Sequence, residues 1–301
     1  MIKSPLNYTG GKAKLLNQIL PLFPKEIDNF FDLFCGGCNV GINVPANHIH
    51  FNDSNKDLIS LYKCLNKVNV NNITNEIYKI INLYNLSLVS KNGYEFYKCN
   101  SSDGLGKYNR DKYNKLKDDY NNMKKDKTTY ILLYVLIVYA FNNQIRFNKK
   151  GEFNLPVGKR DFNKNMEEKL TTFINELQAK QCTFTCSDFR KFDVNQFSKN
   201  DFVYVDPPYL ITCASYNEQN GWNDEDEISL LDFLDKLNNK SIKFALSNVL
   251  TSKGKKNSIL IKWLKSNKNY KAIHLDYNYS NCNYQTKVKN ENCDEVLIIN
   301  Y

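Results

Sequence analysis

Long apolar runs are missing from this 301-residue sequence. The longest is the stretch YILLYVLIVYAF at residues 130–141, whereas a membrane-spanning helix needs about 20 such residues. We interpret this stretch as a buried helix. The N-terminal residues MIKSPLNYTGGK contain no apolar signal core, so nothing there indicates export. We therefore expect a cytoplasmic protein without a membrane partner.

Histidines and paired cysteines are also scarce. The chain has three histidines (His48, His50 and His274), which we interpret as ordinary polar or core residues. It has nine scattered cysteines, and in an unexported chain these are typical of reduced thiols rather than a disulfide framework. Cys35-x-x-Cys38 is half of a zinc site at most, because a structural site needs four ligands at paired spacing. We expect no metal.

Repeats and a disorder-prone composition are lacking too. No short-period repeat occurs, and 42% of the residues are hydrophobic, which is too many for a disordered chain. At about 100–200 residues per domain, the chain has the length of one large or two ordinary domains, and it can bury a substantial core.

The positive charge is concentrated in one part of the chain. The formal net charge is +9, and residues 104–170 hold fifteen Lys and Arg against eight Asp and Glu. This favours a polyanionic partner, although a lysine-rich solvated surface has the same composition. Of only four arginines, Arg146 and Arg160 lie in the Asn- and Gly-rich segment 142–160. Arginine offers a rigid bidentate fork that lysine lacks. We therefore interpret these two arginines as residues with a chemical role rather than as routine positive charge.

The order of the expected elements is that of an α/β nucleotide-binding unit. A strand at residues 29–34 runs into a Gly-rich turn at residues 35–38, and a second strand at residues 48–53 ends in an acid. Helical segments rich in Asn, Lys and Tyr follow from about residue 66, and residues 142–160 are predicted as a hairpin. Further elements are expected at residues 183–187, 201–205, 242–247 and 295–300 (strands) and 224–237 (helix).

The sequence Asp206-Pro207-Pro208-Tyr209 directly follows one of these strands. In an open α/β sheet, ligands bind beyond the carboxyl ends of the strands. Two prolines cannot continue a strand ladder because they lack the N–H group, so they stiffen the turn and leave carbonyl oxygens for a ligand. An acid, a carbonyl and an aromatic ring at one strand end suit a flat heterocycle that carries an amine. Mere loop punctuation by prolines is the alternative.

These residues resemble the Dam-type DNA adenine methyltransferases, and the resemblance covers nearly the whole chain. The matching motifs, in order, are LNYTGGK (6–12), FDLFCGG (31–37), FND (51–53), RFNKKGEFNLPVG (146–158), SDF (187–189), DPPY (206–209) and EVLIINY (295–301). The resemblance implies an α/β fold with a Rossmann-like methyltransferase sheet and helices on both faces. A mostly helical DNA-recognition insert with a β-hairpin, residues 64–166, would interrupt a catalytic domain formed by residues 1–63 and 167–301.

The resemblance also implies that the protein binds S-adenosylmethionine and needs no metal. Asp53, at the end of a strand, suits a ribose diol. Asp32 and Phe34 are expected beside the methionine part, and Asp188 and Phe189 beside the adenine ring. The cofactor-binding residues implied in this way are Tyr8, Lys12, Asp32, Phe34, Gly36, Gly37, Asp53, Asp188, Phe189 and Asp206.

Two details concern the glycine-rich segments. Cys38 stands where the family usually has glycine or another small residue. The segment TGGKAK does not fit a phosphate-binding P-loop, because the upstream glycine is missing and Ala13 stands where Ser or Thr should hold magnesium.

The implied reaction requires a flipped base, because a base inside a duplex is out of reach. Tyr209 would stack on the flipped adenine. Hydrogen bonds from the exocyclic amine to the Asp206 carboxylate and the Pro207 carbonyl would localise the nitrogen lone pair toward the methyl group. Transfer is then direct, by positioning and electrostatics, without a covalent enzyme intermediate. The implied catalytic residues are Asp206, Pro207 and Tyr209.

The hairpin resembles the segment with which the family reads double-stranded DNA. Arg146 corresponds to an arginine that reads a guanine, a contact that discriminates by about 1–3 kcal/mol. Lys159 and Arg160 are expected at phosphates, which position DNA without specifying sequence. The implied recognition residues are Arg146, Asn148, Asn154, Pro156, Lys159 and Arg160. We expect the site GATC or another GA-containing sequence, and a cognate restriction endonuclease acting on the same site is a candidate partner.

Other activities remain open. The same architecture supports amino-methylation of cytosine, although serine is commoner there in place of Asp206. RNA or protein methylation usually carries asparagine at that position. A catalytically idle DNA-binding regulator would have no use for Tyr8, Lys12, Asp53 and Asp206 together. Protection from a nuclease and marking for repair or regulation are both compatible with the sequence.

Overall fold

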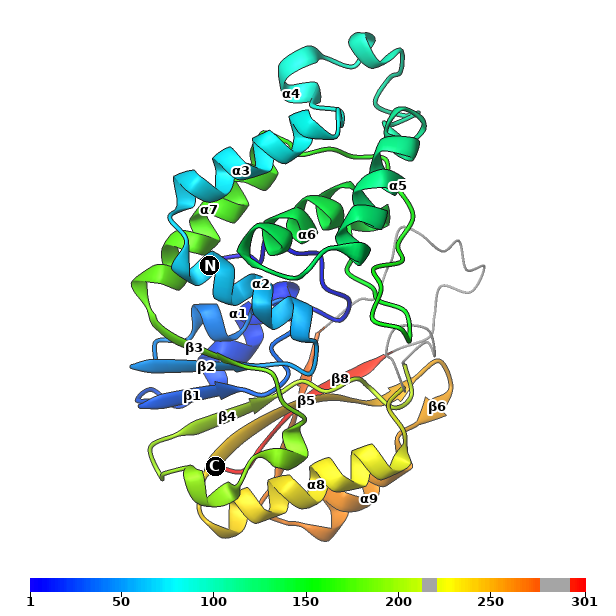
Figure 1. Cartoon of the computed structure of the whole chain (residues 1–301). Coiled ribbons are helices and arrows are strands. Elements are labelled where there is room, and N and C mark those ends of the chain that lie inside the picture. Colours follow the sequence, from blue (N-terminus) through cyan, green and yellow to red (C-terminus); the bar gives the residue numbers. More distant parts are fainter. Residues whose placement is uncertain (213–220, 277–292) are drawn as a thin grey trace. The chain divides into compact units, whose positions relative to one another are not determined.

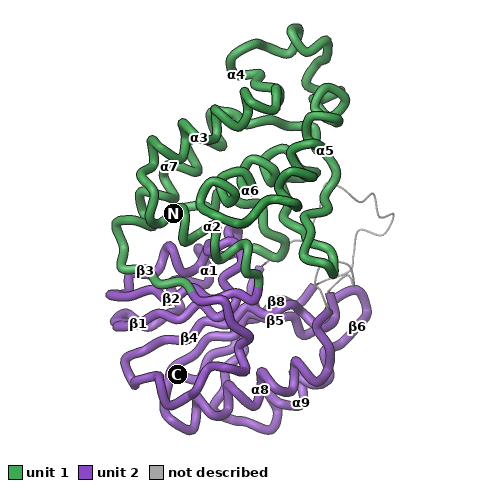
Figure 2. Tube along the Cα trace, in the orientation of Figure 1, with its two compact units in different colours: residues 1–11, 55–184 green, residues 12–54, 185–301 purple. Residues whose placement is uncertain are grey.

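The computed structural model describes residues 1–212, 221–276 and 293–301. The chain forms two compact units (Figure 2): unit 1 comprises residues 1–11 and 55–184, and unit 2 comprises residues 12–54 and 185–301. These boundaries differ from those expected at residues 63/64 and 166/167. The reason is that the helices at the two ends of the expected insert, α2 (Lys56–Lys67) and α7 (Lys164–Ala179), pack with helices inside it. Helix α2 packs against α6 (Lys127–Tyr139), and α7 packs against α3 (Val70–Leu83).

Unit 2 is built around a mixed β-sheet (Figure 1). The strands of the structure are β1 Asn29–Asp32, β2 His48–Asn52, β3 Gln181–Thr185, β4 Phe202–Val205, β5 Lys243–Ser252, β6 Lys255–Lys256, β7 Lys271–Leu275 and β8 Asp294–Ile299. The strand order is β3-β2-β1-β4-β5-β8-β7, with β6 paired to β5, and the chain passes from unit 1 to unit 2 within β3. The pairs β2–β1, β1–β4 and β4–β5 are parallel, whereas β5–β8 and β8–β7 are antiparallel.

Both sides of the unit 2 sheet are covered. Three short helical elements precede β1, namely η1 (Lys12–Lys14), α1 (Leu16–Ile19) and η2 (Leu20–Leu22). The helices that follow β4 include α8 (Asp224–Asn239) and α9 (Ser258–Ser266). Val203 of β4 packs in one core cluster with Leu230 of α8 and Leu260 of α9. The adjacent Phe202 points to the opposite side, because side chains alternate along a strand, and contacts Phe23 directly after η2 at 4.8 Å between ring centroids. The predicted α/β fold is confirmed.

Unit 1 is helical, and its centre is α6. The other helices of unit 1 are α2, α3, α4 (Val89–Asn92), η4 (Glu95–Tyr97), α5 (Gly106–Asn122), η5 (Phe141–Asn143) and α7. Helix α6 packs against α2, α3 and α5, and nearly all its side chains are buried, as expected of a helix that is apolar on all sides. Asp126 begins it with a capping box, in which Asp126 accepts the Thr129 N–H and the Thr129 hydroxyl accepts the Asp126 N–H. The predicted buried helix is therefore confirmed up to Tyr139, whereas Ala140 ends it and Phe141 is exposed.

The segment expected to form a hairpin doubles back on itself with only single antiparallel bridges. These bridges join Ala140 to Val157 and Phe147 to Phe153. Gly151 forms the turn with φ +77°, a left-handed conformation that favours glycine. Phe153 is buried, and its backbone N–H and carbonyl both bond to the side chain of Asn121 in α5. The hairpin is thus anchored to α5 within unit 1.

Strand β7 and helix α9 were not predicted. Residues 271–275 alternate poorly and only Leu275 is buried, because β7 lies at the end of the strand order. Helix α9 spans nine residues, which is short for a periodicity signal. Among the described residues, no helix is both long and apolar enough to cross a membrane.

Candidate active site

Three acidic residues stand at the carboxyl ends of neighbouring parallel strands in unit 2. Asp32 is the last residue of β1, Asp53 directly follows β2, and Asp206 directly follows β4. Because β1 lies between β2 and β4, these carboxyl ends share one edge of the sheet, where ligands bind in such folds. The structure therefore brings together three acids that the sequence placed at the site.

The loop after β1 is tied to the end of β2. Gly36 donates its N–H to Asp53 Oδ2 at 3.0 Å, and Cys35 donates its N–H to the Asn52 carbonyl at 2.8 Å. Gly36 and Cys38 both have positive φ, +43° and +57°. At Cys38 this conformation costs about 1–2 kcal/mol that glycine would avoid. The Gly-rich turn thus holds Asp53 in a defined orientation.

Asp32 has a carboxylate oxygen that no described residue satisfies. Oδ2 accepts the Gly41 N–H at 3.2 Å, whereas the buried Oδ1 has no hydrogen-bond partner among the described residues. Burial raises the pKa of Asp32 well above its ordinary value, and the charges of Asp206 and Asp53 add to this shift. A buried unpaired carboxylate oxygen is costly. It fits a ligand that presents a positively charged or hydrogen-bonding group to it.

Asp206 is held by a buried lysine. Lys12 Nζ lies 2.8 Å from Asp206 Oδ1, and the lysine side chain is only 4% exposed. Burial raises the pKa of Asp206 above its ordinary value, while the Lys12 ammonium opposes that rise. Pro207 and Pro208 follow Asp206 directly in the sequence, and neither has an N–H group to donate. The Asp206 carboxylate and the Pro207 carbonyl are both hydrogen-bond acceptors.

Tyr209 and Glu295 complete this cluster. The Tyr209 hydroxyl oxygen lies 3.1 Å from both Asp206 Oδ1 and Glu295 Oε1, and Lys12 Nζ lies 4.8 Å from the centre of the Tyr209 ring. Glu295, on β8, was not predicted as a site residue. In the sequence, Glu295 is an acid at the start of the apolar run VLII. An acid at the exposed end of a strand would give the same pattern.

Three aromatic rings cluster next to the Gly-rich turn. Phe34, Phe189 and Trp222 have centroid separations of 5.6–5.9 Å. Phe34 directly precedes Cys35, and Phe189 directly follows Asp188. The structure therefore brings Phe34 and Phe189 together and adds Trp222, which sequence reasoning missed because nothing in its neighbourhood marks it.

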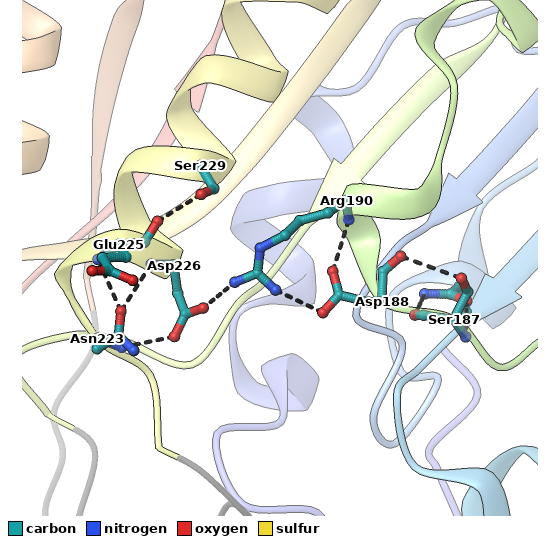
Figure 3. A network of polar contacts seen from close by, with 8 residues as sticks. Ser187, Asp188, Arg190, Asn223, Glu225, Asp226 and Ser229 are labelled. Carbon is teal, nitrogen blue, oxygen red and sulfur yellow. Dashed lines mark hydrogen bonds and ion pairs between the residues drawn. The ribbon is translucent and has the colours of Figure 1, made fainter.

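Arg190 orients Asp188, as Figure 3 shows. Its guanidinium donates to Asp188 Oδ2 at 2.7 Å, and its backbone N–H donates to Asp188 Oδ1 at 2.8 Å. The same guanidinium forms an ion pair with Asp226 in the first turn of α8 and lies 4.8 Å from the centre of the Phe189 ring. Both oxygens of Asp188 are therefore directed by one arginine.

The predicted recognition residues all lie in unit 1. Arg146 donates to Asn154 twice, from Nε to Oδ1 at 2.9 Å and from Nη2 to the backbone carbonyl at 3.1 Å. Asn148 donates to Glu152 at 2.7 Å across the turn. The exposed residues of the set are Asn154, Pro156, Lys159 and Arg160. Arg146, Asn148 and Asn154 thus gather on one hairpin.

The remaining candidates include one cofactor residue and the possible metal ligands. Tyr8 belongs to unit 1, where its carbonyl accepts the Gly11 N–H, and its assignment stays a prediction. The cysteines within the described ranges are free thiols, while Cys213 and Cys282 lie outside those ranges. No group of three or more His, Cys, Asp or Glu able to hold a metal occurs in the described part of the chain. His50 stacks on Phe31, and the other two histidines lie outside the cluster of Asp206.

Comparison with known proteins gives consistent matches. A family model described as D12 class N6 adenine-specific DNA methyltransferase matches residues 8–281. The chain is 44% identical over 306 residues to the Type II methyltransferase M.FokI of Planomicrobium okeanokoites and 41% identical over 306 residues to the modification methylase StsI of Streptococcus sanguinis. Both alignments cover the whole of this chain but 43% of the relative, so the chain spans less than half the length of these two proteins.

A third relative is closer in length. The Type II methyltransferase M.MjaIII of Methanocaldococcus jannaschii is 31% identical over 263 residues, which cover 82% of this chain and 84% of the relative.

Proposed function

Because the chain belongs to the D12 class N6 adenine-specific DNA methyltransferase family, we propose that it transfers a methyl group from S-adenosylmethionine to the N6 amine of a flipped-out adenine in a short double-stranded DNA sequence. One observation carries this proposal: Asp206, at the carboxyl end of β4, is fixed by Lys12 at 2.8 Å and followed by Pro207. We assign the Asp206 carboxylate and the Pro207 carbonyl as the two acceptors for one exocyclic amine.

The cofactor site is proposed at the shared edge of β1, β2 and β4. S-adenosylmethionine, when bound, supplies a methyl carbon attached to a positively charged sulfur. The unsatisfied Oδ1 of Asp32 supports a cationic ligand, and the negative charges of Asp53 and Asp206 act in the same direction. We assign Asp53 to the ribose, and Asp188 to the adenine ring. The complete proposed set is Tyr8, Lys12, Asp32, Phe34, Gly36, Gly37, Asp53, Asp188, Phe189, Asp206 and Trp222.

Asp206, Pro207 and Tyr209 act on the target base. The two hydrogens of the amine donate to the Asp206 carboxylate and the Pro207 carbonyl, which leaves the nitrogen lone pair directed at the methyl carbon. One face of the Tyr209 ring lies under the Lys12 ammonium, so the flipped adenine stacks on the other face. Asp206 accepts a proton only late, after the nitrogen has gained its new bond. Preorganised hydrogen-bond acceptors of this kind supply catalysis without a covalent intermediate.

Sequence recognition is assigned to the hairpin of unit 1. The two bonds to Asn154 hold the Arg146 guanidinium in one plane, which preorganises it for a guanine. Lys159 and Arg160 are exposed and meet phosphates. We expect the site GATC or another GA-containing sequence. Relatives named as type II and modification methylases favour a role in restriction–modification, with a cognate restriction endonuclease as partner. Because the proposed substrate is DNA, we expect the protein to act in the cytoplasm.

The test is methylation of plasmid DNA from a host that lacks adenine methylation. The purified protein is incubated with this DNA and S-adenosylmethionine labelled in the methyl group, and the product is sequenced as single molecules. We expect N6-methyladenine in one short GA-containing motif, and no label with the Asp206→Ala protein.

Each other outcome rejects a defined part of the proposal. Methylated cytosine would replace the substrate base. Cofactor binding without labelled DNA would reject DNA as the substrate. Sequence-specific DNA binding without any cofactor binding would identify a catalytically idle regulator.

A further inference from the structure

Glu295 is a buried carboxylate beside the partly exposed Asp206, and the roles proposed for Asp206, Pro207 and Tyr209 do not involve it. It is 1% exposed. Lys12 Nζ lies 2.8 Å from Asp206 Oδ1 and 3.6 Å from Glu295 Oε1. The Tyr209 hydroxyl oxygen lies 3.1 Å from an oxygen of each acid. One ammonium and one hydroxyl therefore bridge two carboxylates.

The bridging groups cannot satisfy both acids equally. A tyrosine hydroxyl has one hydrogen, so it donates fully to one acceptor at a time, and Lys12 is nearer to Asp206. Among these three side chains, the single positive charge of Lys12 faces two carboxylates. Adding a proton to Asp206 relieves the repulsion between the two acids. Asp206 is the acid that meets solvent, since its side chain is 16% exposed.

We propose that Glu295 is a positioning residue for methyl transfer, which holds Asp206 through Lys12 and Tyr209 and strengthens it as the acceptor of the proton that the target amine releases. This inference rests on the proposed function. As the amine nitrogen forms its bond to the methyl carbon, the carbon–sulfur bond breaks with its electron pair on sulfur. The nitrogen then loses one proton to Asp206, which passes it to water.

The electrostatics around Asp206 agree with this role. Burial raises its pKa, the Lys12 ammonium lowers it, the charge of Glu295 raises it and the hydrogen bond from Tyr209 lowers it. The side chains that change the pKa of Asp206 are thus Lys12 in η1, Glu295 in β8 and Tyr209 in its own turn. Asp32, at the end of β1, interacts with Asp206 through charge. Removing Glu295 or the Tyr209 hydroxyl should therefore move the pKa of Asp206 in opposite directions.

The experiment compares Glu295→Gln and Tyr209→Phe. The single-turnover rate of methyl transfer is measured against pH on a duplex that carries the sequence methylated by the wild-type protein. Glu295→Gln should move the acid limb of the profile to lower pH and reduce the plateau rate about tenfold, because the proton acceptor is weaker. Tyr209→Phe should move the acid limb to higher pH. A merely structural role would not produce shifts of opposite sign.

The matched control is Asp294→Asn, which removes the neighbouring β8 carboxylate, bound to His274 instead of the cluster. It should leave the profile unchanged, and Glu295→Gln should bind S-adenosylhomocysteine, measured by calorimetry, as the wild type does. An acid limb of Glu295→Gln that coincides with the wild type, or shifts of the same sign in both variants, would overturn the proposal.

If Glu295→Gln fails to fold, an unmoved acid limb in Tyr209→Phe overturns the proposal by itself. A wild-type protein that transfers no methyl group to DNA overturns the proposed function instead, and this inference with it.

Discussion

The indole N–H of Trp222 donates a hydrogen bond to Glu227 Oε2 at 2.7 Å, and Glu227 is fully buried. The other oxygen of Glu227 accepts from Asn248 at 3.2 Å and from Asn257 at 2.8 Å. A buried carboxylate with three donors is held rigidly. Glu227 therefore fixes the indole beside Phe189, where the cofactor base is proposed to bind.

Trp222 should report cofactor binding by its fluorescence. The chain has two tryptophans. The second, Trp263 in α9, donates its indole N–H to Asp235 in α8. In the Trp263→Phe protein, S-adenosylhomocysteine should change the emission of the remaining Trp222. In Trp222→Phe, emission should stay constant on addition of the same ligand. The Trp222→Leu protein should bind about fivefold more weakly in calorimetry, as expected for one lost aromatic contact. An emission change from Trp263 alone would contradict the placement.

Asp206→Ala should abolish methyl transfer while ligand binding survives. The carboxylate acts on the amine during the reaction, so its loss should lower the single-turnover rate at least about 10³-fold. Binding of S-adenosylhomocysteine and of DNA, followed by calorimetry and gel shift, should be retained in part. Asp232→Ala, at an exposed position of α8, serves as the control. A rate within tenfold of the wild type would reject Asp206 as the amine's acceptor.

Arg146→Ala should relax sequence choice. If its guanidinium reads a guanine, the loss costs about 1–3 kcal/mol on the cognate site and little on a site that differs at that base. Lys159→Ala is the matched control, because a phosphate contact weakens binding to all sequences alike. Rates on a panel of single-base variants would show the difference. Equal loss of activity on every sequence would reject base reading by Arg146.

Asp126→Ala should destabilise unit 1 by about 1 kcal/mol, the usual value of an N-cap. The backbone and hydroxyl hydrogen bonds of Thr129 lower the pKa of Asp126 below its ordinary value. The stabilisation is therefore present above the unfolded-state pKa and is lost as the pH falls through the lower folded-state pKa. Urea unfolding at neutral and acid pH would show the wild type and variant converging in acid. Asp111→Ala, exposed on α5, should change little.

The parallel strands could be predicted because each is an apolar run closed by an acid or a turn. The predicted strands at residues 29–34, 48–53 and 201–205 correspond to β1, β2 and β4, and their shared direction brings Asp32 and Asp206 to one edge. Glu295 could not be predicted as a partner of Lys12. That contact depends on β8 pairing antiparallel beside β5, and no local pattern specifies pairing between such distant segments.

Trp222 was not predicted as a site residue for a related reason. Its ring meets Phe34 and Phe189 from two other segments, and its anchor Glu227 is a charged residue in an acidic helix start, where exposure is the usual outcome. Burial of Glu227 depends on Asn257, which arrives from beyond β5.

The position of β8 between β5 and β7 has a consequence for synthesis of the chain. Strand β7 leaves the ribosome before β8, yet among the described strands it is β8 that joins β7 to the sheet. Between the end of β5 and the start of β8 lie roughly 40 residues, which take about 2–8 s to translate at 5–20 residues per second. Throughout that interval one edge of β5 has no β8 to pair with, and an open edge is the part of a sheet most prone to aggregation. The nascent chain therefore needs β8 both to cover this edge and to bring Glu295 to Asp206.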